Sequence, residues 1–199
     1  MRYRIVNARI VNEGRVTEGD LSVGHGRISG INTSAGAEAQ VIDAKGAYLL
    51  PGMIDDQVHF REPGFEHKAT IETESQAAVS GGITSFLEMP NCNPQTVTPE
   101  ALEDKHARAA ARSMANYGFY FGATNDNLEA VKSVDQQLAC GIKIFMGSST
   151  GNMLVDNEQT LDGIFRSSPL VIATHCEHTP TILENEAIAR AEHGYAIPF

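Results

Sequence analysis

Two patterns of hydrophobic and polar positions follow one another along the chain. Residues 1 to about 50 hold short strand-like runs at residues 3–11, 21–23, 27–31 and 41–43, which glycine-containing turns separate. A segment of this size is too small to build a full core alone. From about residue 52 onward, strand-like runs alternate with helical stretches, an order typical of a parallel sheet covered by helices. We therefore predict a leading segment over residues 1–51 and an α/β domain over residues 52–199.

Strands in the second part are predicted at residues 52–58, 83–89, 117–121, 142–146 and 170–174. Thr98 begins a cap-and-proline signal for a helix that can run to Asn116, Asp156 begins a capping-box pattern, and Thr179 repeats the cap-and-proline signal. Gly141 is predicted to end a helix just before a strand. These signals give about five strand–helix units. A closed eight-stranded barrel takes about 250 residues, so the sheet is either open or part of something longer.

Charge and composition exclude several classes of protein. The 199 residues carry 15 Lys and Arg against 25 Asp and Glu, a formal net charge of −10. An acidic chain without a cluster of basic residues does not favour a nucleic-acid partner. No apolar run approaches the roughly 20 residues that cross a bilayer, and the first residues lack the pattern of a secretory signal, so we expect no membrane partner and a cytoplasmic location. The three cysteines have no CxxC spacing and are expected to be reduced.

Polar residues whose side chains could bind a ligand or take part in a reaction lie at or near the carboxyl ends of four predicted strands. They are His59, Asn91, Lys143 and His175. Parallel α/β folds place their active sites at these strand ends. This shared placement indicates a site, although each residue alone also suits a structural role.

The segment DDQVHFREPG, residues 55–64, places four polar side chains on one face if the strand alternates regularly. These are Asp55, Gln57, His59 and Arg61. A neutral imidazole such as that of His59 binds zinc, and the guanidinium of Arg61 can hold a carboxylate through two parallel hydrogen bonds. The alternative is a His and an Arg that satisfy turn carbonyls.

Lys143 interrupts the apolar strand GIKIFMG, and ATHCEH ends the last predicted strand. Burial depresses the pKa of a lysine, and a neutral lysine can add carbon dioxide to form a carbamate that bridges metal ions. The alternative is a Lys143 that is ion-paired with Glu88 or another acid. At the end of the last strand, the alternation of side chains between the two faces favours His175 as the inward-pointing ligand. Cys176 is expected to be a buried apolar residue, and His178 is expected to begin the next helix.

Four blocks of the sequence together resemble successive blocks of a dihydroorotase, in the cyclic amide hydrolase group of the amidohydrolase superfamily. They are LPGMIDDQVHFREPG, EMPN, GIKIFMGSSTGNML and ATHCE. The resemblance runs through the whole chain and implies a partial (β/α)8 TIM-type barrel, preceded by strands of a small β-sandwich. Hydantoinases and allantoinases resemble the family elsewhere but usually lack the arginine and asparagine that match Arg61 and Asn91.

The resemblance implies the reversible cyclisation of N-carbamoyl-L-aspartate to L-dihydroorotate, a step of pyrimidine biosynthesis. His59, Lys143 as a carboxylated lysine, and His175 would be ligands of one or two Zn²⁺ ions, and Arg61 and Asn91 would hold the substrate carboxylate. The resemblance identifies no catalytic residue in this chain beyond a metal-activated water. It also implies a homodimer.

Two departures from the family pattern shape the remaining expectations. The first position of the family's HxH signature is Gln57, whose amide oxygen is a poorer zinc ligand than imidazole. Dihydroorotases have about twice this length, and the family's later metal-binding histidine and proton-shuttling aspartate have no counterpart in these residues. We therefore expect an incomplete chain without dihydroorotase turnover of its own. The rival interpretations are a hydantoinase-like or allantoinase-like hydrolase and a non-catalytic homologue.

Overall fold

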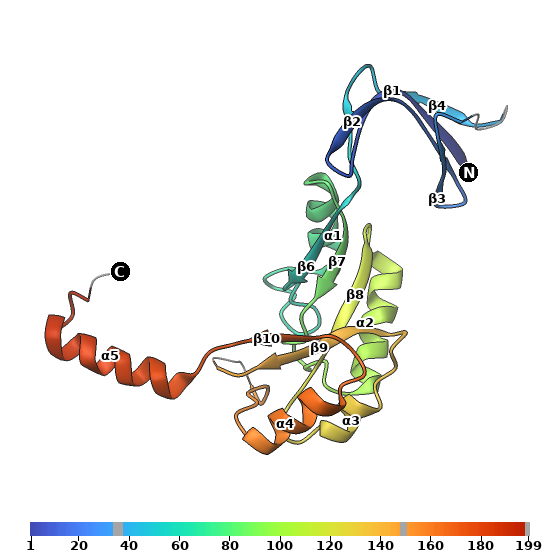
Figure 1. Cartoon of the computed structure of the whole chain (residues 1–199). Coiled ribbons are helices and arrows are strands. Elements are labelled where there is room, and N and C mark those ends of the chain that lie inside the picture. The colour runs from blue at the N-terminus through green and yellow to red at the C-terminus, as the bar shows by residue number, and fades with distance from the viewer. Residues whose placement is uncertain (34–37, 148–150, 198–199) are drawn as a thin grey trace. The chain divides into compact units, whose positions relative to one another are not determined.

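A computed structural model describes residues 1–33, 38–147 and 151–197 of the chain. The serine and threonine positions 148–150, which belong to one of the blocks that carry the family resemblance, lie outside the described residues. The chain divides into two compact units, Met1–Gly52 and Met53–Phe199 (Figure 1). Each unit is built on its own sheet.

The first unit is a five-stranded mixed sheet. Its strands are β1 (Arg2–Asn12), β2 (Arg15–Gly24), β3 (Arg27–Ile31), β4 (Gln40–Asp43) and β5 (Tyr48–Leu49). β1 pairs antiparallel with β2, which pairs antiparallel with β3, whereas β4 and β5 both pair with β1 in parallel. The strand predicted over residues 21–23 was too short, because residues 15–19 also pair with β1. The two-residue strand β5 was not predicted.

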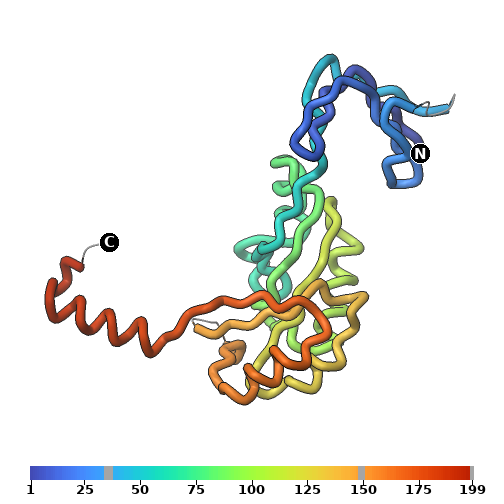
Figure 2. Tube along the Cα trace, viewed as in Figure 1, coloured from blue at the N-terminus to red at the C-terminus, as the bar shows by residue number. Residues whose placement is uncertain are grey.

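The second unit is an α/β half-barrel. Its strands are β6 (Met53–Val58), β7 (Ile83–Glu88), β8 (Asn116–Gly122), β9 (Ala139–Phe145) and β10 (Ile172–His175). All four pairings are parallel, and the strands lie in chain order from β6 to β10, as the Cα trace also shows (Figure 2). This curled parallel sheet confirms the predicted fold class, a partial TIM-type barrel beside a separate sheet.

A helix follows each strand of the second unit. The helices are α1 (Ile71–Ser80), α2 (Pro99–Arg112), α3 (Leu128–Lys132), α4 (Glu158–Ser167) and α5 (Thr179–His193). Thr98 caps α2 as predicted, since its side chain accepts from the backbone N–H of Ala101. The helix does not reach Asn116, because the backbone becomes extended at Ser113 and Asn116 already belongs to β8.

Two further helix starts differ from the prediction by one residue. The N-cap of α4 is Asn157, whose side chain accepts from the backbone N–H of Thr160, while Asp156 accepts from Asn125. The N-cap of α5 is His178 without a side-chain cap hydrogen bond. His178 therefore does begin this helix, as the sequence predicted.

Gly141 does not end a helix, because it lies inside β9. It pairs with Tyr120 of β8, and a Cβ at this position would lie only 2.7 Å from the Tyr120 ring and 3.0 Å from the carbonyl oxygen of Val171. The glycine therefore permits close packing within the sheet, and the helix-end prediction was wrong.

The core of the second unit lies between the sheet and the helices α1 to α4. Phe119 of β8 and Ile142 and Ile144 of β9 are fully buried and cluster with helix residues such as Leu102. Because side chains alternate along a strand, Lys143 lies on the opposite face of β9. Burial of the apolar positions against the helices thus sets the face on which the predicted site residues lie.

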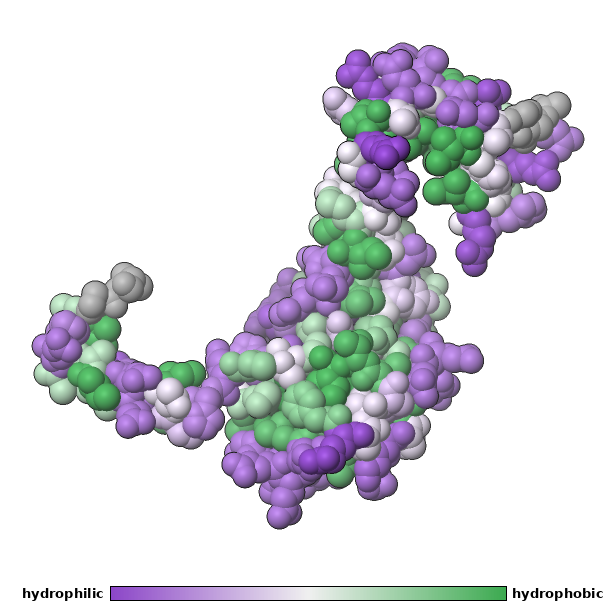
Figure 3. All heavy atoms as spheres, viewed as in Figure 1, coloured by the Kyte–Doolittle hydropathy of each residue, from purple (hydrophilic) through white to green (hydrophobic). Residues whose placement is uncertain are grey.

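Within the part of the chain that the structure describes, β6 and β10 each pair with one neighbour and form the two edges of the sheet. Large apolar side chains beside these edges are exposed, with Ile54 at 67% and Val171 at 68%. Figure 3 shows apolar side chains gathered on the visible face of this unit. No described helix is long and apolar enough to cross a membrane.

Candidate active site

Two predicted site residues from neighbouring strands are in direct contact. His59 directly follows β6, Asn91 follows β7, and His59 Nδ1 lies 2.8 Å from Asn91 Oδ1. A carboxamide oxygen only accepts hydrogen bonds, so the neutral imidazole donates from Nδ1 and keeps its lone pair on Nε2. This hydrogen bond therefore leaves Nε2 available to a ligand.

The environment of His59 disfavours its charged form. Its pKa is lowered mainly by burial, with smaller contributions from the positive charges of Arg61, Lys143 and Lys105, while the hydrogen bond to Asn91 acts in the opposite direction. A neutral imidazole is the form that binds a metal ion.

Arg61 has a backbone conformation that is uncommon for a residue with a side chain. Its φ is +69°, in the left-handed region, and its side chain is half-buried. A register shift between Asp55 and Val58 also interrupts the regular strand alternation. The common face predicted for residues 55–61 therefore does not follow from simple parity. The turn at Arg61 determines where its guanidinium lies.

Lys143 is buried, at 3% exposure, and its Nζ lies 4.9 Å from the centre of the Phe145 ring. Its pKa is lowered by burial, against a smaller opposing effect of Cys176. Glu88 forms an ion pair with Lys105 instead. The alternative prediction of an ion pair between Lys143 and Glu88 was therefore wrong. A buried lysine with a lowered pKa is the form that can react with carbon dioxide.

His175 ends β10 and shares a face with Lys143. In the parallel ladder, Ala173 lies beside Lys143 and His175 lies beside Phe145, and residues two apart on a strand point to the same side. His175 Nε2 lies 3.0 Å from Glu177 Oε1.

The prediction that Cys176 is a buried apolar residue was wrong. Cys176 is exposed because β10 ends at His175, and its thiol lies 2.7 Å from the hydroxyl of Thr174.

The donor set determines what metal the site can accept. Among the described residues, no group of three or more His, Cys, Asp and Glu side chains could hold a metal ion. The predicted ligands His59, Lys143 and His175 are donor types that zinc accepts once the lysine carries a carboxylate. Gln57, an exposed residue of β6, contributes only an amide.

Two buried carboxylates behind this site were not predicted. Glu88 Oε2 lies 2.6 Å from Lys105 Nζ. Glu62 is fully buried, accepts a hydrogen bond from the backbone N–H of Ile71 and pairs with Arg112. The sequence held one signal for this arrangement, because Lys105 occupies the spacing of the buried stripe on α2, three residues after Leu102.

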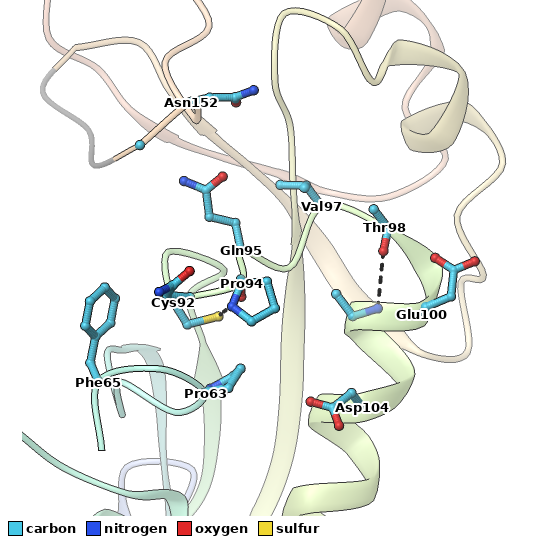
Figure 4. Close-up of a pocket in the computed structure, with 13 residues that line it drawn as sticks. Pro63, Phe65, Cys92, Pro94, Gln95, Val97, Thr98, Glu100, Asp104 and Asn152 are labelled. Atoms are coloured by element: carbon cyan, nitrogen blue, oxygen red, sulfur yellow. Dashed lines mark hydrogen bonds between the residues drawn. The ribbon is translucent and has the colours of Figure 1, made fainter. Parts of the chain in front are cut away.

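A cavity of about 770 Å³ lies beside the site loops rather than at the site. Figure 4 shows residues that line it, among them Pro63 and Phe65 after β6, Cys92 and Gln95 after β7, and Asp104 on α2. The described residues that line it do not include the predicted site residues.

Comparisons with known proteins agree with this fold. The L-hydantoinase of Arthrobacter aurescens superposes with a TM-score of 0.87 at 29% identity, over 96% of this chain and 44% of that chain. A D-hydantoinase superposes with a TM-score of 0.76 at 27% identity, over 100% of this chain and 46% of that chain. The curled parallel sheet, with polar residues at its strand ends, thus defines a barrel protein of the amidohydrolase superfamily.

The family follows from sequence comparison. Residues 46–191 match the family described as Dihydro-orotase-like, and the chain belongs to this family. It is 34% identical to a dihydroorotase of Halobacterium salinarum, over 98% of this chain and 47% of that protein, and 34% identical to an allantoinase of Deinococcus radiodurans, over 87% and 40%. The chain spans less than half the length of these curated relatives.

Proposed function

We propose that this chain contributes the substrate-carboxylate site and part of the metal site of a dihydroorotase. Such an enzyme reversibly cyclises N-carbamoyl-L-aspartate to L-dihydroorotate in pyrimidine biosynthesis. The observation that supports this proposal is the contact of 2.8 Å between His59 and Asn91, beside the positive charge of Arg61. This arrangement combines an imidazole, a side chain that can bind zinc, with an amide and a guanidinium that can bind a carboxylate.

Arg61 and Asn91 have complementary roles in this proposal. The guanidinium of Arg61 donates two parallel hydrogen bonds to the substrate carboxylate. Asn91 Oδ1 already accepts from His59, so the amide group of Asn91 is the part that donates to the carboxylate. Both residues therefore select a ring or chain that carries an acid group.

Zinc is the proposed cofactor. His59 through Nε2, Lys143 as a carbamate, and His175 are the proposed ligands. Carbamate formation joins the neutral Lys143 nitrogen to the carbon of carbon dioxide and releases one proton. When bound, the metal polarises the amide carbonyl and lowers the pKa of the attacking water.

The second candidate is a hydantoinase-like hydrolase, which the superposition on the L-hydantoinase favours. The two candidates differ in whether the substrate carries a carboxylate. Arg61 is the residue that separates them, because a hydantoin ring without an acid group gives its guanidinium no anion to bind.

The experiment compares binding of N-carbamoyl-L-aspartate and of hydantoin to the full chain, followed by NMR at the backbone amides of Arg61 and Asn91. For Arg61→Met we expect at least about tenfold weaker binding of N-carbamoyl-L-aspartate and unchanged binding of hydantoin, since a charge-assisted bidentate contact is lost. Arg166→Met, at an exposed arginine of α4, is the control. Tighter binding of hydantoin, or no effect of Arg61→Met, would contradict the proposal.

A further inference from the structure

A fully buried ion pair lies behind the site, on the helix side of the sheet. Lys105 of α2 and Glu88, the last residue of β7, have side chains that are each 1% exposed, and their charged atoms are 2.6 Å apart. Removing two charges from water costs several kcal/mol per ion, and their attraction offsets this only when further hydrogen bonds satisfy both groups. The further contacts of this pair therefore indicate what it does.

Glu88 is connected to the first site loop. Burial raises the pKa of the Glu88 carboxyl, and a hydrogen bond from the backbone N–H of Phe60, the residue between His59 and Arg61, is among the effects that lower it. The ring of Phe60 is buried and packs against Phe86, with the ring centres 4.4 Å apart. The residue that links the proposed metal ligand to the proposed carboxylate ligand thus interacts with Glu88 through its backbone and with Phe86 through its ring.

Lys105 is connected to the second site loop. Its Nζ donates to the backbone carbonyl of Met89 at 3.2 Å. Met89 lies two residues before Asn91, and its own N–H donates to the carbonyl of Val58, the residue before His59. Through Glu88 and Met89, one lysine therefore contacts the framework of both loops.

We propose that the Lys105–Glu88 pair positions the His59–Arg61 segment against the Asn91 loop. Both are positioning residues, because they hold backbone groups beside the site and lie on the helix side of the sheet. A pair that served only the stability of the core would be replaceable by apolar side chains without effect on His59. The inference depends on the proposed function for what the site binds, but its test uses signals that need no substrate.

The test compares two double variants of the full chain. Glu88→Met with Lys105→Met removes both charges and the acceptor for the Phe60 N–H. Glu88→Gln with Lys105→Met also removes both charges but keeps an oxygen acceptor at position 88. The two differ in one polar group of similar size, so a difference between them reports the hydrogen bond to Phe60.

Three signals are measured for each variant: ¹⁵N NMR of the His59 ring, hydrogen exchange of the Phe60 amide, and affinity for Zn²⁺ alone. In the Met/Met variant we expect at least tenfold faster exchange at Phe60, loss of the single His59 tautomer, and about tenfold weaker Zn²⁺ binding, as expected when groups that orient a metal ligand are lost. In the Gln/Met variant we expect Phe60 exchange and the His59 tautomer near those of the unaltered chain.

Glu129→Gln with Lys132→Met, at an exposed ion pair on α3, is the matched control and leaves all three signals unchanged. Unchanged His59 and Phe60 signals in a folded Met/Met variant would overturn the proposal. Failure of both double variants to fold would also overturn it, because the pair would then be inseparable from the core. Failure of the proposed function would appear instead as absent binding of N-carbamoyl-L-aspartate, with these substrate-free signals intact.

Discussion

His59 and Asn91 connect the ends of β6 and β7 through one side-chain hydrogen bond of 2.8 Å between Nδ1 and Oδ1. The bond directs the Nε2 lone pair of His59 away from Asn91 and leaves the amide group of Asn91 free to donate elsewhere. One contact thus defines the chemical role of both residues. A partner that fixes the tautomer of a ligating histidine also raises its affinity for metal.

We predict that Asn91→Ala releases the His59 ring. The ring then populates both neutral tautomers, and the affinity for Zn²⁺ falls by about tenfold, as expected for loss of a residue that orients a ligand. ¹⁵N NMR of the imidazole and a Zn²⁺ titration measure the two effects. Asn93→Ala, at an exposed residue of the same loop, is the control. A single His59 tautomer in Asn91→Ala would show that the hydrogen bond does not orient the ring.

The fold was predictable because burial is periodic. The alternation of strands and helices after residue 52 predicted the parallel sheet, and the cap at Thr98 predicted the start of α2. The prediction that Gly141 ends a helix was wrong, because a glycine before an apolar run suits both a helix end and a tight contact inside a sheet. Only the pairing of β9 with β8 distinguishes these two roles.

The residues of the candidate site were predicted because they stand at or near the carboxyl ends of strands, but the residues that support them were not predicted. Whether Lys105 reaches Glu88 depends on how α2 packs against β7, which is a tertiary relationship. The turn at Arg61, with its φ of +69°, likewise has no signal in a single sequence. The candidate positions thus followed from the pattern of strands along the sequence, whereas the geometry around them required the fold.

Glu62 is a second point at which the site loop is anchored. Its buried carboxylate accepts from the N–H of Ile71 at the start of α1 and pairs with Arg112. We predict that Glu62→Ala lowers the free energy of unfolding by about 2 kcal/mol, because a buried N–H loses its partner. Urea unfolding measures the loss. Glu103→Ala, at an exposed position of α2, should change the free energy by less than about 0.5 kcal/mol, and equal effects would contradict the anchoring role.

Gly141 tests the packing of the curled sheet. We predict that Gly141→Ala lowers the free energy of unfolding by about 1–3 kcal/mol, because its Cβ would lie 2.7 Å from the Tyr120 ring and 3.0 Å from a backbone oxygen. The control is Gly81→Ala, whose Cβ would meet its nearest neighbour at an ordinary 3.5 Å. Urea unfolding of both variants provides the comparison. A Gly141→Ala variant as stable as Gly81→Ala would show that β8 and β10 do not approach β9 this closely.

The cysteines differ in reactivity for physical reasons. Burial raises the pKa of the Cys140 thiol from 9.0 to about 11. A raised pKa keeps the thiol protonated, and the thiolate is the nucleophile, so at pH 8 the reactive fraction of Cys140 is about a hundredfold smaller than for a thiol of pKa 9. Cys176 is exposed, whereas Cys92 is buried with its Sγ 3.1 Å from the carbonyl oxygen of Pro94.

We therefore predict that iodoacetamide at pH 8 alkylates Cys176 first in the folded chain. Labelling of Cys140 should rise only as the pH approaches 11, and peptide mass spectrometry assigns the label to each position. In denaturant all three cysteines should react alike, which is the control for intrinsic reactivity. Equal rates for Cys140 and Cys176 at pH 8 in the folded chain would mean that β9 opens to solvent. Lys143 lies three residues further along the same strand and would then be open to solvent as well.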